Sequence, residues 1–531
     1  METQSQRCRR RPEKPVSGTA HFFKRLPLKK KRAGGFGQEH QEVFVRDDRP
    51  IGAEACSRAL ETDPAGIEAR LKEELKKLGR KIVVLDDDPT GIQTVHDVYV
   101  YTDWKQETLE EAFQDQNSMF FILTNSRGMT SVETERVHRE IARNLLSAAR
   151  RTRKDFLLVS RSDSTLRGHY PLETQTLREE LEASGGKRYD GEIIYPFFKE
   201  GGRFTLNGVH YVKEGASLTP AGMTEFARDK SFAYHSSYLP NWCQEKSGGA
   251  IRAEDVLRIP LEALQGAEID RVTQLLLSCR DFRRVVVDSV DDLDVSVFSA
   301  ALCRAIARGK EFLIRSAAAV PRALSGNPPR PLLSRPDLID ENCKAGGMVL
   351  IGSHVQKTTA QLEGLKASSA LLEWIEFNQH LALEPGGLSR EAERSAFLAE
   401  KAIRAGKTAV VYTRRERLDL DTEDPDRQLL ITTEISDAVT SVVGRLTVKP
   451  RFLIAKGGIT SSDVGVKALK VKRALALGQV KPGIPVWLTG AESKFPSMPY
   501  LIFPGNVGTV EELREIVELL SGDGGKEPYE S

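Results

Sequence analysis

"KIVVLDDDPTG", residues 81–91, joins a run of β-branched and aliphatic residues to three adjacent carboxylates. Like charges side by side repel one another and suit neither a helix interior nor a buried strand. The Pro-Thr-Gly that follows favours a turn. Ligands of open α/β sheets bind at the carboxyl ends of the strands. The stretch therefore predicts a strand whose end carries Asp86, Asp87 and Asp88 at the mouth of a crevice. A solvated acidic turn is the alternative.

Apolar strand-like runs alternate with amphipathic helical stretches along most of the chain. Short, nearly all-apolar strands separated by helices are typical of a parallel sheet covered on both faces. Near residue 321 the proline-rich "PRALSGNPPRPLLSRPDL" interrupts this pattern, which resumes with "GGMVLIGSH". The predicted fold class is α/β, with two α/β domains of mostly parallel sheets and the active site in the interdomain cleft. The expected divisions are a basic disordered extension at 1–65, a first domain at 66–320, a linker at 321–345 and a second domain at 346–525.

The composition is that of a globular protein from a reducing compartment. Of 531 residues, 40% are hydrophobic and 29% charged, and the net charge of +2 implies no general attraction to nucleic acid. The six cysteines form no C-x-x-C pair and the histidines form no metal-binding cluster. No window of about 18 uncharged apolar residues could span a membrane. We expect a cytoplasmic protein without nucleic-acid or membrane partners, and leave a homo-oligomer open.

The amino-terminal tail is strongly basic and rich in proline and glycine, a composition typical of disorder. It has no apolar stretch of the kind found in secretory signals. A targeting segment, an unstructured extension and a mis-set start codon are all compatible with this tail.

Two further strand ends in the first domain carry arginine beside small polar residues: "TNSRGMT" (124–130) and "SRSDSTLRGHY" (160–170). A guanidinium forks onto a carboxylate or phosphate, and hydroxyls bind neighbouring oxygens. The candidates for binding a small polyhydroxy acid in the second stretch are Arg161, Asp163, Ser164 and Arg167. Surface ion pairs are the alternative. "GGRFTLNGVHYV" (201–212) adds Arg203, Thr205 and His210, with an ordinary hairpin turn as its alternative.

Strand ends in the second domain are rich in glycine: "LIGSH" (350–354), "AKGGITSSDVG" (455–465), "WLTG" (487–490) and "FPGNVGTVEEL" (503–513). Glycines let backbone N–H groups approach phosphate oxygens, and a helix expected to start at 460–463 would point its positive end at them. Lys456 would add a charge. Each stretch alone is more simply a tight turn, but together they predict a site for nucleotide phosphates.

Two familiar nucleotide motifs are absent. "AGKT" (405–408) matches the tail of a Walker A motif, but Lys401 stands where its first glycine belongs and the expected order is helix then strand. Gly406 is more simply the residue that ends a helix. No strand end carries G-x-G-x-x-G, which counts against a dinucleotide site.

These motifs, in their order, make the chain resemble the four-carbon acid sugar kinase family from about Lys81 to Leu520. The motifs are "DDDPTG", "SRSDSTLRG", "GGRFTLNGVHYV", "TEFARD", "GSHVQKTTAQLE", "KGGITSSDVG" and "FPGNVG". The resemblance implies a sugar-acid-binding domain followed by an ATP-binding domain. It implies phosphorylation of the terminal hydroxyl of an acid such as threonate, erythronate or 3-oxotetronate. The expected partners are thus a small sugar acid and ATP, with Mg²⁺ as a further cofactor.

The resemblance also transfers roles to residues. Asp87 and Asp88 match the catalytic carboxylates, one of which would orient or deprotonate the acceptor hydroxyl. The substrate-binding residues are Thr90, Gly91, Arg161, Asp163, Ser164, Arg167, Arg203 and Thr205. The nucleotide-binding residues are Ser353, Lys456, Gly457, Gly458, Ile459, Thr460 and Gly505. Of these, Lys456 is the residue predicted above to add a charge. No metal ligands are assigned.

Two of the nucleotide-binding residues, Gly458 and Ile459, carry further expectations. A side chain at Gly458 would enter the space of a phosphate and oppose any positive φ there. Ile459 departs from the family, in which many members read G-G-E-T, and its side chain cannot bind a cation.

Three functional interpretations remain open from the sequence. The first is an ATP-dependent carbohydrate kinase with an alcohol group as acceptor. The second is an NAD-linked hydroxyacid dehydrogenase on a similar two-domain frame. The third is a catalytically silent protein that binds nucleotide or sugar acid. A screen for ADP release over four- and five-carbon acids separates the first from the others.

Overall fold

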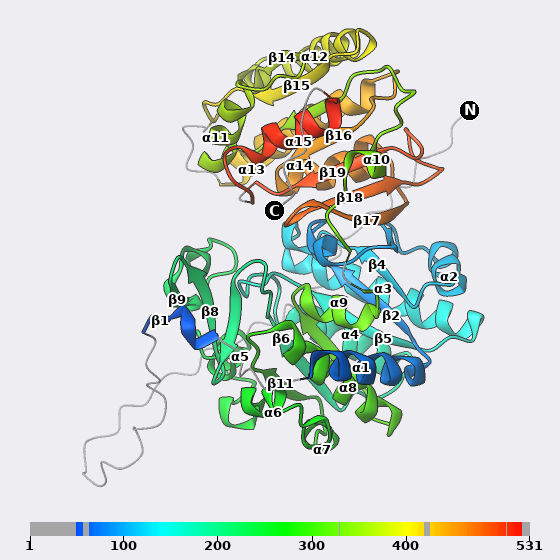
Figure 1. Cartoon of the computed structure of the whole chain (residues 1–531), viewed down its shortest axis with the longest axis vertical. Helices are drawn as coiled ribbons and strands as arrows, with labels where there is room; N and C mark the ends of the chain where they lie inside the picture. Colours follow the sequence, from blue (N-terminus) through cyan, green and yellow to red (C-terminus); the bar gives the residue numbers. More distant parts are fainter. Residues whose placement is uncertain (1–48, 57–62, 329, 419–424, 506, 523–531) are drawn as a thin grey trace, which may run out of the picture. The chain divides into compact units, whose positions relative to one another are not determined.

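A computed structural model describes residues 49–56, 63–328, 330–418, 425–505 and 507–522. Most strands of these residues form one fifteen-stranded sheet (Figure 1). In spatial order its strands are β10 (Leu257–Ile259), β11 (Arg283–Val287), β6 (Gly191–Tyr195), β12 (Phe312–Ser316), β5 (Phe156–Arg161), β2 (Lys81–Asp86), β4 (Met119–Leu123), β3 (Val98–Tyr101), β17 (Arg473–Lys481), β18 (Ile484–Thr489), β19 (Pro499–Phe503), β16 (Leu453–Lys456), β13 (Met348–Ile351), β15 (Thr408–Thr413) and β14 (Leu372–Phe377). Neighbouring strands are parallel except around β17 and β18. The mostly parallel α/β fold predicted from the sequence is therefore confirmed.

Residues 63–328 form the first lobe, where helices cover both faces of the sheet from β10 to β3. One face packs against α1 and α8, and the other packs against α2, α3 and α4. Both faces of β2 are buried, which explains its continuous apolar run. The helices of this lobe are α1 (Pro64–Leu78), α2 (Gln106–Gln114), α3 (Ser131–Thr152), α4 (Leu172–Ala183), α5 (Leu239–Lys246), α6 (Leu261–Gln265), α7 (Ile269–Leu277), α8 (Asp292–Ala307) and α9 (Ala319–Ser325).

Residues 330–522 form the second lobe, built in the same way around β17 to β14. Helices α12 and α13 pack on one face, and α11 and α15 pack on the other. Helix α12 precedes β15, so the "AGKT" stretch has the helix-then-strand order that was predicted. The helices are α10 (Arg335–Leu338), α11 (Gln356–Leu365), α12 (Gly387–Arg404), α13 (Pro425–Arg445), α14 (Gly458–Asp463) and α15 (Glu512–Ser521), and a π-helical turn, η8 (Val464–Ala468), follows α14. No helix of the described residues has the length and apolarity needed to cross a membrane.

The two lobes share one sheet because β3 and β17 pair in antiparallel register, from Arg473 opposite Tyr101 to Ala476 opposite Val98. The sequence did not indicate this joint. Strand β17 alternates buried and half-buried residues and lacks the all-apolar run of the other strands. In the expected linker, the Leu333 N–H donates to the Gln479 carbonyl on β17 at 2.7 Å.

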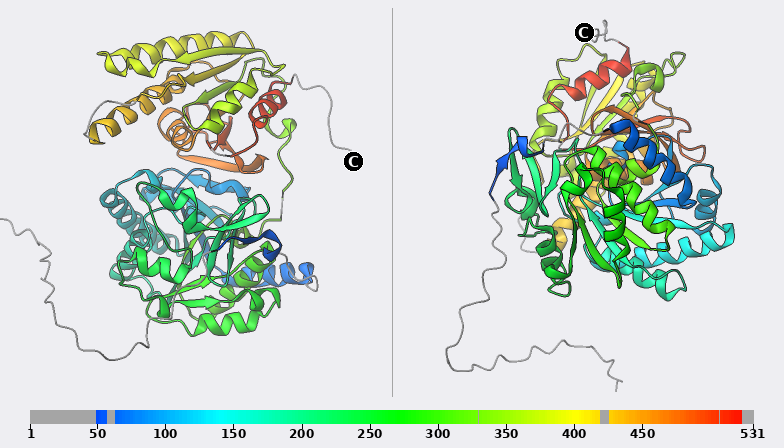
Figure 2. Two further views of the ribbon diagram at one scale, coloured as in Figure 1. Left: turned by 90° about the vertical axis from the view of Figure 1, so that its left-hand side faces the viewer. Right: turned by 60° about the horizontal axis from the view of Figure 1, so that its bottom comes forward.

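A small antiparallel sheet stands beside the large sheet within the first lobe (Figures 1 and 2). Its order is β1 (Ile51–Gly52), β9 (Ser217–Pro220), β8 (Val209–Glu214) and β7 (Arg203–Leu206). The predicted disordered extension at 1–65 is wrong where β1 pairs with β9, because the uncharged apolar residues there differ from the basic tail. Residues 1–48 and 57–62 lie outside the described residues.

Helix α3 begins with a capping box that fixes the chain just after "TNSRG". Thr130 Oγ1 accepts from the Glu133 N–H at 3.2 Å, and Glu133 Oε2 accepts from the Thr130 N–H at 3.0 Å. We expect Thr130→Ala to lower the free energy of unfolding by about 1 kcal/mol, because a helix N–H loses its acceptor. Urea denaturation measures this. Thr130→Ser should keep most of the stability, and an equal loss in both variants would contradict the capping role.

Candidate active site

The three adjacent carboxylates lie where the sequence predicts, at the carboxyl end of β2 between β5 and β4. Asp86 closes the strand, and its carbonyl accepts from the Thr124 N–H at 2.8 Å. The Asp87 N–H donates to the Arg161 carbonyl at 3.3 Å. Both side chains are buried, so the alternative of a solvated acidic turn is wrong for these two residues.

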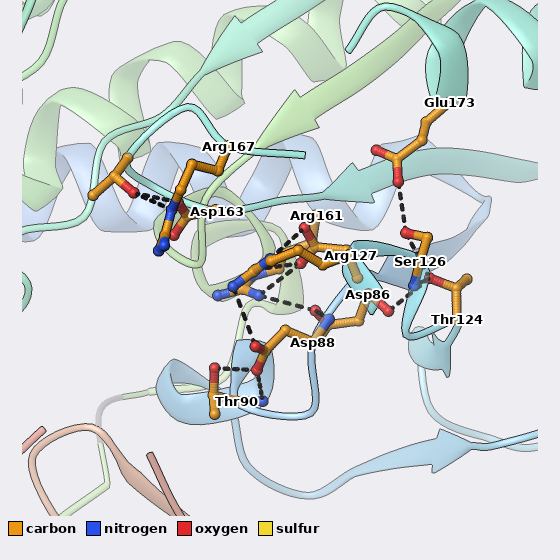
Figure 3. A network of polar contacts seen from close by, with 12 residues as sticks. Asp86, Asp88, Thr90, Thr124, Ser126, Arg127, Arg161, Asp163, Arg167 and Glu173 are labelled. Carbon is orange, nitrogen blue, oxygen red and sulfur yellow. Dashed lines mark hydrogen bonds and ion pairs between the residues drawn. The ribbon is translucent and has the colours of Figure 1, made fainter. Parts of the chain in front are cut away.

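Arg127 binds two of these carboxylates at once. It lies on the short helix η3 (Ser126–Gly128), directly after β4. Its Nη2 and Nε donate to the two oxygens of Asp87 at 2.7 and 3.2 Å, and its Nη1 donates to Asp88 Oδ2 at 3.2 Å. Figure 3 shows the guanidinium reaching Asp88 beside Arg161. The forked donor set thus holds the two carboxylates in a fixed relation to each other.

Arg161 binds the buried side of the same cluster. Its Nη1 donates to Asp86 Oδ1 at 3.1 Å and to Asp87 Oδ1 at 3.3 Å, and the side chain is buried. The expected contact of Arg161 with a substrate carboxylate therefore competes with two carboxylates of the protein itself.

The three carboxyl groups differ in acidity because their surroundings differ. Burial raises the pKa of Asp86 to about 7 despite the nearby Arg161. Burial also raises the pKa of Asp87, against the opposing charges of Arg127 and Arg161. For Asp88, burial is outweighed by those two arginines and by hydrogen bonds from Thr90, so its pKa is lowered. Asp88 is therefore the most acidic of the three groups.

A second turn in the first lobe carries the predicted Asp163, Ser164 and Arg167. Arg167 Nε donates to Asp163 Oδ2 at 2.8 Å, and the Thr165 hydroxyl also donates to that oxygen. Burial would raise the pKa of Asp163, but the charges of Arg127 and Arg167 hold it well below its usual range. Like Arg161, Arg167 is thus already paired with a protein carboxylate.

The hairpin of β7 and β8 supports this turn from behind. The Thr205 hydroxyl lies 3.0 Å from His210 Nδ1, and His210 Nε2 lies 2.8 Å from the Ser164 carbonyl. A carbonyl only accepts, so Nε2 carries the ring proton. Burial lowers the pKa of His210 to about 4, which keeps the ring neutral near pH 7. Thr205 is therefore buried against the His210 ring. The structure does not place its hydroxyl for the predicted contact with substrate.

Arg203, at the start of β7, lies near the same turn. Its guanidinium and that of Arg167 each lie 5.2 Å from the centre of the Phe226 ring. Burial lowers the pKa of Arg203, and its Nε has no hydrogen-bond partner in the structure. Its Nη1 donates to the Gly201 carbonyl, but among the described residues Arg203 forms no ion pair, whereas Arg161 and Arg167 do. The charge of Arg203 is thus more available to a ligand.

Four of the residues predicted to bind nucleotide come together in the second lobe. A Cβ at Gly505 would lie 2.9 Å from Ser353 Oγ, and a Cβ at Gly457 would lie 3.1 Å from Ser353 Cβ. A Cβ at Gly352 would lie 2.3 Å from Thr460 Oγ1. The bare backbones of three strand ends therefore meet around Ser353, as a phosphate cradle requires.

The loop itself differs from the prediction in three respects. The positive φ, 120°, belongs to Gly457, whereas Gly458 is the first residue of α14, which begins earlier than expected. Lys456 is fully buried, donates to the Pro504 carbonyl at 3.0 Å and lies over the Phe503 ring. Burial lowers its pKa to about 7, so it is a weaker charge than expected. Ile459 is 70% exposed.

The acidic turn and the glycine loop approach each other across the two lobes. A Cβ at Gly458 would lie 3.8 Å from Asp88 Oδ2. Thr90 orders the acidic turn here, since its N–H and hydroxyl donate to Asp88 Oδ1 at 2.8 and 2.5 Å. Gly91 lies against Asp86, where a Cβ would come within 2.1 Å of Oδ2. Thr90 and Gly91 thus shape the turn that carries the carboxylates.

The donor set offers no ready-made metal site. Within the part of the chain that the structure describes, no group of three His, Cys, Asp or Glu side chains is placed to hold a metal ion. Mg²⁺ in phosphoryl-transfer sites keeps several waters and uses one or two carboxylates together with substrate phosphates. Asp88, ionised and close to Gly458, fits that limited role.

Two family models match the chain. A sugar-binding amino-terminal domain matches residues 82–324, and a nucleotide-binding carboxyl-terminal domain matches residues 348–513. These ranges contain the acidic turn and the glycine loop respectively. The comparison with curated proteins gives no match.

Two solved structures share this fold at low sequence identity. One, from Salmonella typhimurium LT2 and provisionally named a tRNA synthase, is 17% identical with a TM-score of 0.60, over 83% of this chain and 99% of the other. The second is a Haemophilus influenzae protein that is 16% identical with a TM-score of 0.53, over 82% of this chain and 99% of the other. Both similarities concern the fold.

The glycine loop makes a testable prediction. Gly457→Ala would place a Cβ at a φ of 120° and 3.1 Å from Ser353, a strain of about 1–3 kcal/mol. We expect ATP affinity, measured by calorimetry, to fall about tenfold or more. Gly444→Ala on α13 is the matched control, since its Cβ would meet nothing closer than 3.8 Å. Unchanged ATP affinity in a folded Gly457→Ala protein would remove the loop from the nucleotide site.

Proposed function

Since this chain belongs to the four-carbon acid sugar kinase family, we propose that it is an ATP-dependent kinase for the terminal hydroxyl of a four-carbon sugar acid. Threonate, erythronate and 3-oxotetronate are the candidate substrates. The observation that carries the proposal is the approach of Asp88 to Gly458, because it puts an acidic turn beside a glycine cradle. Phosphoryl transfer asks a protein mainly for such positioning and for electrostatic stabilisation.

Asp87 and Asp88 would have different roles because their environments differ. Asp87, buried and with a raised pKa, is suited to accept the proton of the acceptor hydroxyl. Asp88 stays ionised and lies on the side of the glycine loop, where it would hold the nucleotide's Mg²⁺ through water or directly. The bound ion would supply charge neutralisation for the phosphates.

Arg127 is the positive group between the two halves of the site. It contacts both Asp87 and Asp88, so it lies beside any phosphoryl group that passes from the glycine loop to a hydroxyl on Asp87. Asp87 accepts two hydrogen bonds from Arg127 and one from Arg161, so its carboxylate can still accept one from the hydroxyl. The Arg127 guanidinium would at the same time face the transferring oxygens, which carry negative charge.

The nucleotide half is supported by the backbone. Ser353, Gly457 and Gly505 follow close-packed strand ends, and Thr460 lies in the first turn of α14, where the first N–H groups of a helix have no acceptor inside it. Ile459 contributes an exposed apolar side chain at this position, so its side chain adds no charge to the cradle.

The primary test is release of ADP over a panel of four- and five-carbon aldonic and oxo acids. We expect Asp87→Asn to lower kcat by about a hundredfold or more, the usual scale for loss of a general base. Asp229→Asn is the control, since this half-buried carboxylate pairs with Arg167 at 3.7 Å and accepts from the Ser231 and Phe232 N–H groups, which the Asn side-chain oxygen can also bind. Wild-type turnover in the Asp87→Asn protein would exclude Asp87 as the base.

The pH dependence tests Arg127. The rate rises as Asp87 loses its proton, and Arg127 lowers the pKa of that group. Removing the cation should raise this pKa, so Arg127→Met should move the acidic limb of kcat/KM to higher pH. Arg127→Lys should move it less, because it keeps the charge. Identical limbs in all three proteins would show that Arg127 does not tune the base.

A further inference from the structure

Arg315 is a buried arginine that forms no ion pair with any carboxylate of the described residues. It lies near the end of β12 and is 2% exposed. Its Nη2 donates to the Arg167 carbonyl at 3.3 Å, and its Nε has no partner. Burial raises the pKa of Glu192 and the charges of Arg284 and Arg315 lower it, but of these two arginines only Arg284 is ion-paired with that carboxylate. Burying a guanidinium without a direct ion pair is costly, so Arg315 calls for an explanation.

An aromatic pair fixes the orientation of this guanidinium. The Tyr170 and Trp242 rings stack with centroids 4.4 Å apart, and the guanidinium carbon lies 5.2 and 5.0 Å from their centres. Such contacts stabilise a cation without consuming its N–H donors. Arg315 is therefore held in place while donors remain free for an anion.

Gly168 lies between Asp87 and Arg315. Its φ is 117°, and a Cβ there would lie 3.6 Å from Asp87 Oδ2 and 3.9 Å from Arg315 Nη2. The base proposed above and this guanidinium thus flank the same backbone position. A short acid bound there would place a hydroxyl on Asp87 and its carboxylate on Arg315.

We propose that Arg315 binds the carboxylate of the acid substrate, the role that the sequence assigned to Arg161 and Arg167. The proposal rests on the function proposed above. It is favoured because Arg161 is paired with Asp86 and Asp87, and Arg167 is paired with Asp163. A guanidinium paired with the protein's own carboxylates has little charge left for another.

Steady-state kinetics tests the assignment. Arg315→Met should raise the KM for the acid about tenfold to a hundredfold, the scale of a charged hydrogen bond, and leave the KM for ATP within twofold. Arg315→Lys keeps the charge but loses the fork, so it should recover only part of the affinity. Arg284→Lys is the matched control, since Arg284 stacks over Phe282 but is paired with Glu192. A wild-type acid KM in folded Arg315→Met or Arg315→Lys protein would overturn the proposal.

A binding measurement separates this proposal from the kinase function. Titration of threonate without ATP should change the fluorescence of Trp242, and Trp242→Phe should remove that signal. Threitol, which has no carboxylate, should bind wild type and Arg315→Met equally, whereas threonate should lose its advantage in the variant. In one outcome, wild type releases no ADP with any acid while its preference for threonate over threitol still depends on Arg315. That result would exclude the kinase function and support the role of Arg315 in binding the carboxylate. A preference for threonate that survives in Arg315→Met would overturn the role of Arg315, whatever the kinetics show.

Discussion

Two guanidinium groups make it feasible to bury a run of aspartates at the end of a central strand. Without Arg127 and Arg161, Asp86 and Asp87 would carry uncompensated charge in a dry environment, or would be protonated. The two arginines come from the strands on either side of β2, one after β4 and one at the end of β5. The register of β5, β2 and β4 therefore places these arginines against the aspartates. A ligand that binds there meets a network in which the opposite charges largely offset one another.

The sequence predicts the parts of the fold that depend on local pattern. The end of β2 at Asp86, the helix-then-strand order at Gly406 and the glycine-rich strand ends all follow from short-range rules. Strands β12, β14 and β17 give a weaker local signal, because charged or half-exposed residues break their apolar runs. Pairing of β3 with β17 joins residues more than 370 positions apart, and no local pattern records it.

The site shows the same division. Residue types at strand ends identify the acidic turn, the arginine-rich turn and the glycine loop. They do not reveal which arginine is paired internally, because pairing depends on the spatial neighbour. "TNSRGMT" drew attention to a strand end, but only the structure shows that Arg127 joins Asp87 to Asp88. Arg315 follows an apolar run and gives no signal in the sequence, because its importance lies in the absence of an ion-pair partner among the described residues.

The shared sheet has a consequence for how the protein is made. Strand β3 ends at Tyr101, but its partner β17 begins only at Arg473, so β3 is synthesised long before β17. During synthesis the first lobe therefore carries an unprotected strand edge, which can pair with other chains. The same edge would be bare in any fragment that ends at the linker. The second lobe thus covers the exposed edge of the first. Dividing the gene between the lobes would produce a first lobe that is prone to aggregate through β3, whereas in the whole chain that edge is paired.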